Sequence, residues 1–240
     1  MRALMIQHDH ICTPGFVGER FVDRGYDLGV HQVVSESRFR SPNVETQFPA
    51  PTDFDVIITM GAPWSVYDHE TIGSWVLPEL AMLRDAHHDH VPVFGICFGG
   101  QLLAAAHGGS VSRAGTPEIG WVEIESDAES LVPAGEWFQW HYDSWELPEG
   151  ATELARNASS SQAFILGRNL AVQFHPEMSS AILASWIVTG GAEEMSRLGI
   201  EVDELVRQTA ERDGSNCARA HKLVDLFLDR VAVQSGVGRG

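Results

Sequence analysis

Cysteine and positive charge are both scarce in this sequence. Among 240 residues there are three cysteines, Cys12, Cys97 and Cys217, and no CxxC pair. A disulfide framework is therefore not expected, and a reducing, cytoplasmic compartment is predicted. Lys and Arg together number 16 against 33 Asp and Glu, which gives a net charge of -17. This balance argues against nucleic acid and anionic membrane as partners, because it offers them no basic surface.

Long apolar runs, leader segments and phosphate loops are also missing. The longest apolar stretch, 181–188, is far shorter than the ~20 residues that span a membrane. The first residues lack the apolar centre of a signal peptide, and there is no GxxxxGK[ST] loop for nucleotide phosphates. The His-rich segment 87–90 has a spacing that suits no standard zinc pattern and is interpreted as a solvated loop. No metal and no cofactor is therefore predicted.

Apolar runs alternate with amphipathic segments through the first half of the chain. Strands are predicted at 3–6, 30–34, 55–60 and 91–96. Helices are predicted at 14–25, 74–88 and 98–107, with Pro78 near the first turn of its helix, where proline is tolerated. Strands that alternate with helices at this spacing pair in parallel, which indicates an α/β fold.

The second half of the sequence is less regular. Short β-like pieces at 121–125, 137–140, 163–166 and 171–174 predict a mixed extension of the sheet. Helices are predicted at 180–188, 202–211 and 217–231, with a break at 212–216 between the last two. The chain is therefore interpreted as one domain, 1–240, with a C-terminal helical segment at 191–235.

One cysteine lies in the turn between a predicted strand and a predicted helix. Gly95-Ile96-Cys97-Phe98-Gly99 has the G-x-nucleophile-x-G form of a nucleophile elbow. The glycines allow a sharp turn, and the following helix directs its N-terminal N–H groups and positive dipole end at the sulfur. The alternative is a small buried cysteine packed between strand and helix. The flanking glycines favour the nucleophile, because packing alone does not require them.

A cysteine nucleophile needs a base and a place for the oxyanion. His175 follows the predicted strand 171–174 at the edge where α/β folds bind ligands, and Glu177 is placed to orient its ring. A packed loop histidine and a helix-capping glutamate are the alternatives. The backbone N–H of Phe98 and the turn Gly61-Ala62-Pro63 are candidate oxyanion donors, although the turn could be a simple Gly-Pro turn. The segment 8–12, rich in His and Asp, is interpreted as a loop near the same edge.

These motifs together resemble one known family. Gly95-Ile96-Cys97-Phe98-Gly99-Gly100-Gln101, with His175-Pro176-Glu177 downstream, is similar to class I glutamine amidotransferase domains, in particular to the glutaminase part of GMP synthetase. The resemblance covers residues 57–178. It implies a flavodoxin-like, doubly wound, mostly parallel sheet with helices on both faces. It also implies a Cys-His-Glu triad in which Cys97 attacks, His175 acts as general acid and base, and Glu177 orients the imidazole.

The resemblance also implies positions for the substrate. Gln101 and the segment Trp140-His141-Tyr142-Asp143 match places where the family holds the amino-acid end of glutamine, and Trp64 follows the oxyanion turn closely enough to border it. Residues 118–121 are typical of stand-alone members without an implied role. Two positions depart from the family. Ala62 and Tyr142 stand where many members have glycine, and Tyr142 puts strict selectivity for glutamine in question.

Three functions remain open from the sequence. The first is a glutaminase or amidotransferase that forms a γ-glutamyl thioester on Cys97 and delivers ammonia to a separate acceptor enzyme, since the chain is too short to include a synthetase. The second is a γ-glutamyl hydrolase or peptidase, which Tyr142 and the missing acceptor domain favour. The third is a non-catalytic interaction module, against which the intact Cys97, His175 and Glu177 argue.

Overall fold

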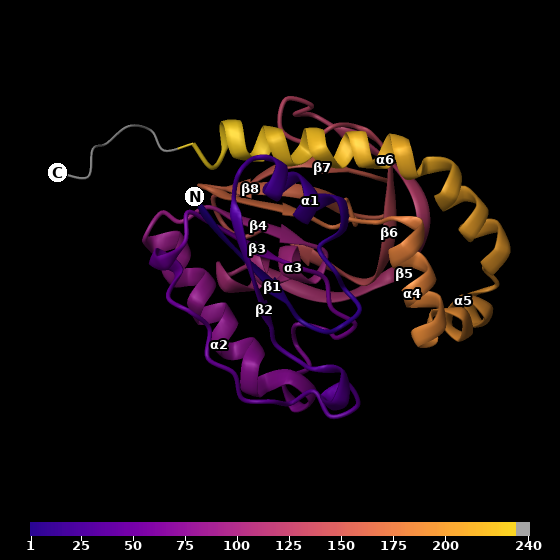
Figure 1. Cartoon of the computed structure of the whole chain (residues 1–240), viewed down its shortest axis with the longest axis horizontal. Helices are drawn as coiled ribbons and strands as arrows, with labels where there is room; N and C mark the ends of the chain where they lie inside the picture. Colours follow the sequence, from indigo (N-terminus) through magenta and orange to yellow (C-terminus); the bar gives the residue numbers. More distant parts are fainter. Residues whose placement is uncertain (234–240) are drawn as a thin grey trace.

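The computed structural model describes residues 1–233 (Figure 1). They form a nine-stranded sheet in the order β2-β1-β3-β4-β9-β8-β7-β5-β6. The first five of these strands are parallel, and the remaining pairings are antiparallel, so the sheet is mixed. The strands are β1 (Arg2–Gln7), β2 (Asp27–Gln32), β3 (Val56–Thr59), β4 (Val93–Ile96), β5 (Ser110–Ser126), β6 (Gly135–Glu146), β7 (Thr152–Arg156), β8 (Ser161–Leu166) and β9 (Asn169–Val172).

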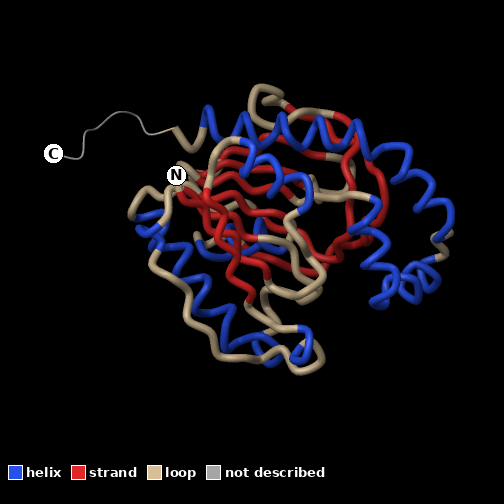
Figure 2. Tube along the Cα trace, in the orientation of Figure 1, coloured by secondary structure: helices blue, strands red, loops and turns tan. Residues whose placement is uncertain are grey.

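Helices pack against the parallel part of the sheet from two sides. Helices α1 (Gly15–Asp23) and α6 (Val202–Arg230) share one buried apolar cluster with alternate residues of β1, β3 and β4. Helices α2 (His69–His88) and α3 (Phe98–Ala106) share a second cluster with the other residues of these strands. Figure 2 shows the strands at the centre and the helices around them. The predicted α/β class is confirmed.

Helix α2 begins earlier than its apolar spacing predicted. The Asp68 side chain accepts a hydrogen bond from the Thr71 N–H (3.2 Å) and caps the helix at His69 rather than at residue 74. The prediction that Pro78 lies near the first turn is therefore wrong, because Pro78 stands in the middle of a 20-residue helix. Its position on the exposed side lets water satisfy the carbonyl that loses its N–H partner.

The predicted break at 212–216 is also wrong, since α6 runs unbroken through it for 29 residues. Tertiary contacts hold these polar residues in the helix. The Arg212 guanidinium donates to both carboxylate oxygens of Glu136, each at 3.1 Å. The buried Asn216 amide donates to the backbone carbonyl of Met178 at 2.8 Å. Local helix propensity, on which the prediction relied, is a weak term beside such contacts.

Ahead of α6 the chain forms α4 (Ser180–Trp186), a π-helical turn (Ile187–Gly191) and α5 (Ala192–Leu198). The predicted helical segment 191–235 thus contains α5 and α6, and its last two residues lie outside the described part of the chain. The pieces predicted at 121–125 and 137–140 belong to a much longer hairpin, because β5 has 17 residues and β6 has 12. In β5 the exposed and buried residues do not alternate regularly, and in β6 the alternating buried positions include the polar residues Gln139, His141 and Asp143. Neither strand therefore shows its full length as an apolar alternation in the sequence.

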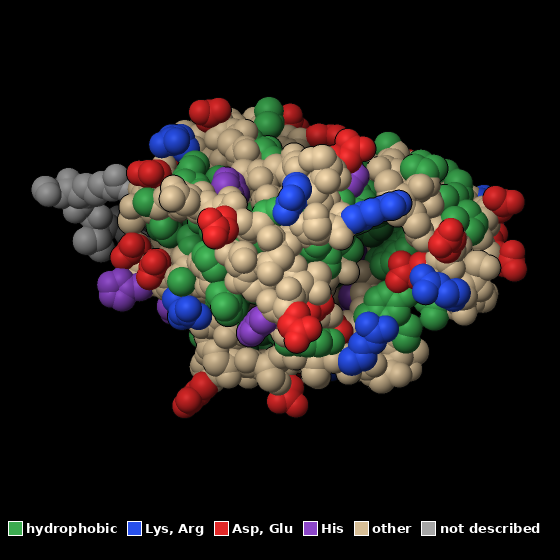
Figure 3. All heavy atoms as spheres, turned by 90° about the horizontal axis from the view of Figure 1, so that it is seen from below, with side chains coloured by type: hydrophobic (Ala, Val, Ile, Leu, Met, Phe, Trp, Pro, Cys, Tyr) green, Lys and Arg blue, Asp and Glu red, His purple; other side chains and the backbone are tan. Residues whose placement is uncertain are grey.

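On the face shown in Figure 3, Asp and Glu side chains stand apart from one another with Lys and Arg between them, and a recess lined by hydrophobic side chains opens beside them. Within residues 1–233, no helix combines the length and the apolar character needed to cross a bilayer.

Candidate active site

Cys97 occupies a strained turn between β4 and α3. Its φ is +51°, a conformation that side chains other than glycine rarely adopt. The turn requires glycine on both sides. A Cβ on Gly95 would lie 2.6 Å from the Gly99 carbonyl oxygen, and one on Gly99 would lie 2.0 Å from the Thr59 carbonyl oxygen. The strand and helix can therefore approach closely enough to hold the thiol at the N-terminus of α3.

His175 and Glu177 lie next to this cysteine because β9 pairs with β4. The register pairs Ile96 with Val172, and the Cys97 N–H donates to the Val172 carbonyl at 2.8 Å. Three residues after Val172, the His175 Nδ1 lies 2.7 Å from the Glu177 carboxylate. Since a carboxylate only accepts, Nδ1 carries the proton of this bond. The His175 Nε2 makes no hydrogen bond within residues 1–233 and is free to act on the thiol.

The charges of this cluster favour a protonated imidazole. Burial lowers the pKa of His175, but the Glu177 carboxylate and Cys97 outweigh it and raise that pKa to about 10. A second thiol, Cys12, also lines the pocket. Burial, with the charges of Asp9 and Glu177, raises the pKa of the Cys12 thiol, which keeps it protonated and a poor nucleophile. Cys12 is thus held as a neutral thiol, and Cys97 is the cysteine that interacts with His175.

One pocket of about 360 Å³ brings these groups together with most of the predicted substrate residues. It is lined by the sequence-predicted residues Cys97, Phe98, Ala62, Trp64, Gln101, Trp140, His141, Tyr142, Asp143 and His175. Glu177 lies behind His175 and is completely buried. Gly61 is not in the lining, and it packs against the His175 ring, where a Cβ would lie 3.1 Å from Cε1. The N–H groups of Ala62 and Phe98 donate to no protein atom in the described part of the chain.

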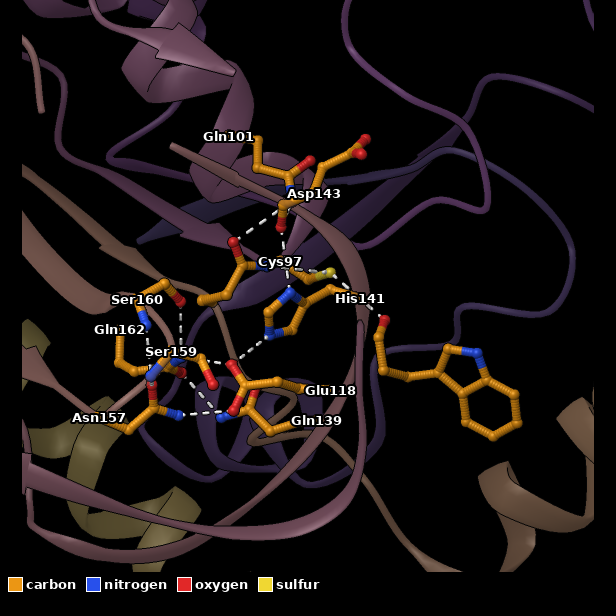
Figure 4. A network of polar contacts seen from close by, with 12 residues as sticks. Cys97, Gln101, Glu118, Gln139, His141, Asp143, Asn157, Ser159, Ser160 and Gln162 are labelled. Carbon is orange, nitrogen blue, oxygen red and sulfur yellow. Dashed lines mark hydrogen bonds and ion pairs between the residues drawn. The ribbon is translucent and has the colours of Figure 1, made fainter. Parts of the chain in front are cut away.

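A buried polar network fixes the β6 side of the pocket (Figure 4). The Gln101 amide donates to the Asp143 carbonyl at 3.2 Å, and the His141 Nδ1 donates to the same carbonyl at 3.0 Å. The His141 Nε2 lies 3.3 Å from a Glu118 oxygen. The Asp143 carboxylate itself is occupied, because Tyr67 donates to it at 3.0 Å. Gln101 and Asp143 are therefore held in place by the protein rather than exposed as free ligands.

Glu118 orients a neighbouring histidine, a role that its sequence motif did not predict. Its carboxylate accepts from Asn157 at 2.7 Å and from Gln162 at 3.1 Å, and it faces His141 (Figure 4). Burial raises the pKa of Glu118, but the interactions with His141, Asn157 and Gln162 outweigh it and lower that pKa. Glu118 thus remains charged and orients the His141 ring beneath the pocket wall.

Several further residues in the pocket or next to it were missed by the sequence. The Gln173 amide donates to the Cys97 sulfur at 3.6 Å, and the Trp186 ring packs edge-on against His175 with centroids 5.0 Å apart. Arg113 lies over the Tyr142 ring, 4.3 Å from its centroid, and Glu194 accepts from the Trp140 indole at 3.3 Å. Gln173 follows β9, whereas the other residues come from β5, α4 and α5. The approach of these elements to the pocket depends on the long hairpin and on α5, which the sequence placed only within a general helical segment.

A second buried His–Glu pair lies behind the turn Gly61-Ala62-Pro63. His8, directly after β1, and Glu79, on α2, are both completely buried. The His8 Nε2 lies 3.0 Å from the Glu79 carboxylate, and its Nδ1 lies 3.1 Å from the Gly61 carbonyl oxygen. Thr59 also donates to Glu79, at 2.9 Å. Burial lowers the pKa of His8, but Glu79 outweighs it and raises that pKa. The sequence placed His8 near this edge without a partner, because Glu79 is distant along the chain.

Comparisons with known proteins agree with this architecture. A family model described as "Glutamine amidotransferase class-I" matches residues 17–187. The GMP synthase [glutamine-hydrolyzing] of Thermomicrobium roseum is 30% identical over 236 residues, covering 87% of this chain and 42% of that protein. The corresponding protein of Aeropyrum pernix is 36% identical over 143 residues, covering 54% and 28%. The chain therefore spans less than half the length of these relatives.

Solved structures of similar size share the fold. A glutamine amidotransferase from Methylobacillus flagellatus superposes with a TM-score of 0.84 at 26% identity, covering 100% of this chain and 98% of that one. One from Thermotoga maritima gives a TM-score of 0.82 at 22% identity, covering 95% and 98%, which is evidence for the fold alone.

Proposed function

We propose that this chain, which belongs to the class I glutamine amidotransferase family, is a glutaminase that hydrolyses the side-chain amide of L-glutamine and releases ammonia for a separate acceptor enzyme. One observation carries the proposal. A thiol on a nucleophile elbow and an imidazole with a free Nε2 line one pocket, and a buried carboxylate lies 2.7 Å from the Nδ1 of that imidazole. This is the arrangement that acyl transfer by a cysteine nucleophile requires.

The chemistry proceeds in two halves. The Cys97 thiolate attacks the amide carbon, and His175 protonates the departing nitrogen as the C–N bond breaks, which leaves a γ-glutamyl thioester and ammonia. Water, deprotonated by His175, then attacks the thioester and releases glutamate and the thiolate. Glu177 holds the imidazole in the required tautomer and stabilises its positive charge. The net reaction consumes one water and needs no cofactor.

The backbone supplies the oxyanion donors in this proposal. The N–H groups of Ala62 and Phe98 lack protein partners and belong to residues that line the pocket beside Cys97. Gly61 contributes the close approach of the turn to His175. Hydrogen-bond donors that are oriented before the reaction stabilise the oxyanion far more than mobile water does, and each contributes about 10²–10³-fold to kcat.

The pocket suits a free amino acid. Its lining includes the positive side chain of Arg113 and the negative side chain of Glu194, which match the carboxylate and ammonium groups of glutamine, while the Asp143 carboxylate is occupied by Tyr67. Aromatic side chains of Trp64, Trp140 and Tyr142 form its apolar wall, and the β6 segment presents backbone groups.

The ammonia acceptor is proposed to be a separate protein. The relatives are named as synthases, and this chain covers less than half of their length. They therefore extend well beyond the region that this chain matches. A second candidate function, γ-glutamyl hydrolase or peptidase, is favoured by Tyr142. Its ring lines the pocket where it would contact a leaving group larger than ammonia.

The test is the release of ammonia and glutamate from L-glutamine by the purified chain, beside a Cys97→Ala control and a panel of γ-glutamyl dipeptides. We expect hydrolysis of glutamine that disappears in the control. Turnover of the dipeptides without turnover of glutamine would replace the glutaminase by the hydrolase. Silence on every substrate, with no labelling of Cys97 by a glutamine-derived electrophile, would reject both enzymes in favour of an interaction module.

A further inference from the structure

The imidazole of His8 is fixed on every side. Both ring nitrogens have partners, the Gly61 carbonyl at Nδ1 and the Glu79 carboxylate at Nε2. The ring stacks on Trp75 with centroids 5.5 Å apart and meets the edge of Phe98 at 4.9 Å. Because both partners are acceptors, both nitrogens carry protons and the ring is an imidazolium, whose charge Glu79 balances. Such a ring can neither rotate nor exchange its partners without leaving a buried charge unpaired.

The partner at Nδ1 belongs to the peptide that supplies an expected oxyanion donor. The Gly61 carbonyl and the Ala62 N–H are parts of the same planar trans peptide, so they point in opposite directions. Holding the carbonyl against His8, in the core, directs the N–H away from the core. Ala62 lines the pocket with Cys97 on that other side, whereas Gly61 does not line it.

The alternative orientation of this peptide would disable the site. With the peptide turned over, a carbonyl oxygen would face the position of the developing oxyanion and repel it. Glycine offers little resistance to such a rotation, since it has no Cβ. The hydrogen bond from His8 is the contact within residues 1–233 that fixes the Gly61 carbonyl, and a charged donor makes it stronger than a bond between neutral groups.

We propose that His8, held by Glu79, is a positioning residue that locks the Gly61–Ala62 peptide with its N–H directed toward the oxyanion. The proposal rests on the glutaminase function above, and it deepens that function by assigning the preformed state of the oxyanion turn to one imidazole. Phe98, whose N–H is the other expected donor, touches the same ring through its side chain. A single buried group therefore contacts both residues that supply donors.

Two paired variants isolate the hydrogen bond. Asparagine places an amide nitrogen near the position of the histidine Nδ1, whereas leucine fills the space without a donor. Both are made on the Glu79→Gln background, which removes the buried charge that His8 would otherwise leave unpaired. We expect the Glu79→Gln, His8→Leu protein to lose about 10²-fold in kcat for glutamine, the cost of one oxyanion donor, with KM nearly unchanged. The Glu79→Gln, His8→Asn protein is expected to recover most of that loss.

Alkylation of Cys97 by iodoacetamide separates positioning from general damage. This displacement develops no oxyanion, so its rate should be the same in both variants, whereas a collapsed site would slow alkylation and hydrolysis together. Equal kcat in the two variants, or a loss of alkylation that parallels the loss of hydrolysis, overturns the proposal.

Crystal structures of the two variants test the orientation of the Gly61–Ala62 peptide without an activity assay. We expect the Ala62 N–H to face the pocket in the Asn variant and the peptide to be turned over or mixed in the Leu variant. An unchanged peptide in the Leu variant overturns the proposal. If the wild-type chain hydrolyses no γ-glutamyl substrate, the glutaminase fails, while the orientation of this peptide is still decided by the two structures.

Discussion

A methyl group added at Gly99 should damage both the stability and the chemistry of this protein. In Gly99→Ala the new Cβ would lie 2.0 Å from the Thr59 carbonyl oxygen, which belongs to the backbone of β3. Helix α3 and strand β3 must separate by about 1.4 Å before that contact reaches the 3.4 Å of ordinary van der Waals packing. The separation also strains the hydrogen bond from the Gly99 N–H to the Met60 carbonyl, now 3.0 Å.

The magnitudes follow from this displacement. Overpacking of a rigid core costs about 1–3 kcal/mol, and we expect the upper end because the opposing atom is backbone. Cys97 and Phe98 begin the same helix, so they move with it, and a misplacement of about 1 Å can reduce the catalytic rate by roughly 10²-fold. Urea unfolding measures the first effect, and glutamine hydrolysis with iodoacetamide labelling of Cys97 measures the second.

Gly73→Ala is a matched control on helix α2. A Cβ there meets nothing nearer than the His69 Cβ at 3.5 Å. This change should stabilise the protein by about 0.5–1 kcal/mol through helix propensity and leave the thiol unaffected. If Gly99→Ala proves as stable and as reactive as Gly73→Ala, the close approach of α3 to β3 does not hold the elbow, and the reasoning is refuted.

Three further outcomes are expected. Glu177→Gln removes the charge that raises the pKa of His175, so the alkaline limb of kcat/KM should move toward neutral pH, and an unmoved limb would contradict the proposed role of Glu177. Because the folded pKa of His175, about 10, lies above its ordinary value of 6.5, its stabilising contribution is complete below pH 6.5 and is lost as pH rises toward 10. The free energy of unfolding of the wild-type protein should therefore fall by several kcal/mol over that pH window relative to that of His175→Gln. Chemical denaturation at each pH measures both free energies, and parallel curves for the two proteins would contradict this contribution of His175. Tyr142→Gly should lower kcat/KM for γ-glutamyl dipeptides about 10-fold relative to L-glutamine, since an aromatic contact with the leaving group is lost; an unchanged ratio would remove Tyr142 from the selectivity of the pocket.

The elements nearest the cysteine could be predicted because their signals are local. Gly95 and Gly99 mark the turn, and buried apolar runs mark β3 and β4. His175 could be placed at the same edge because parallel strands share their carboxyl ends. The pairing of β9 directly with β4, which brings His175 beside Cys97, is a tertiary fact that the sequence pattern did not contain.

The parts that could not be predicted depend on contacts between distant residues. The polar run 212–216 stays helical because Arg212 and Asn216 find partners on β6 and after β9. The His8 ring has a charged partner only because α2 packs Glu79 against it. Glu118 lies in segment 118–121, which is typical of stand-alone family members. Its contact with His141 could not be predicted, because it requires the pairing of β5 with β6. Local propensity does not report any of these contacts.

Helix α6 is the last described element to leave the ribosome, yet it completes the loop that carries His175, the proposed catalytic base. The Asn216 amide donates to the carbonyls of Met178 and Pro176, on either side of Glu177. During synthesis these buried carbonyls have no partner until α6 has emerged and docked, because the chain is made from its N-terminus. A nascent chain can therefore form the sheet and the cysteine elbow while the base remains loosely held. If Cys97, His175 and Glu177 act as proposed, ammonia release would begin only after α6 has emerged and docked, so nascent chains that lack α6 would not consume glutamine.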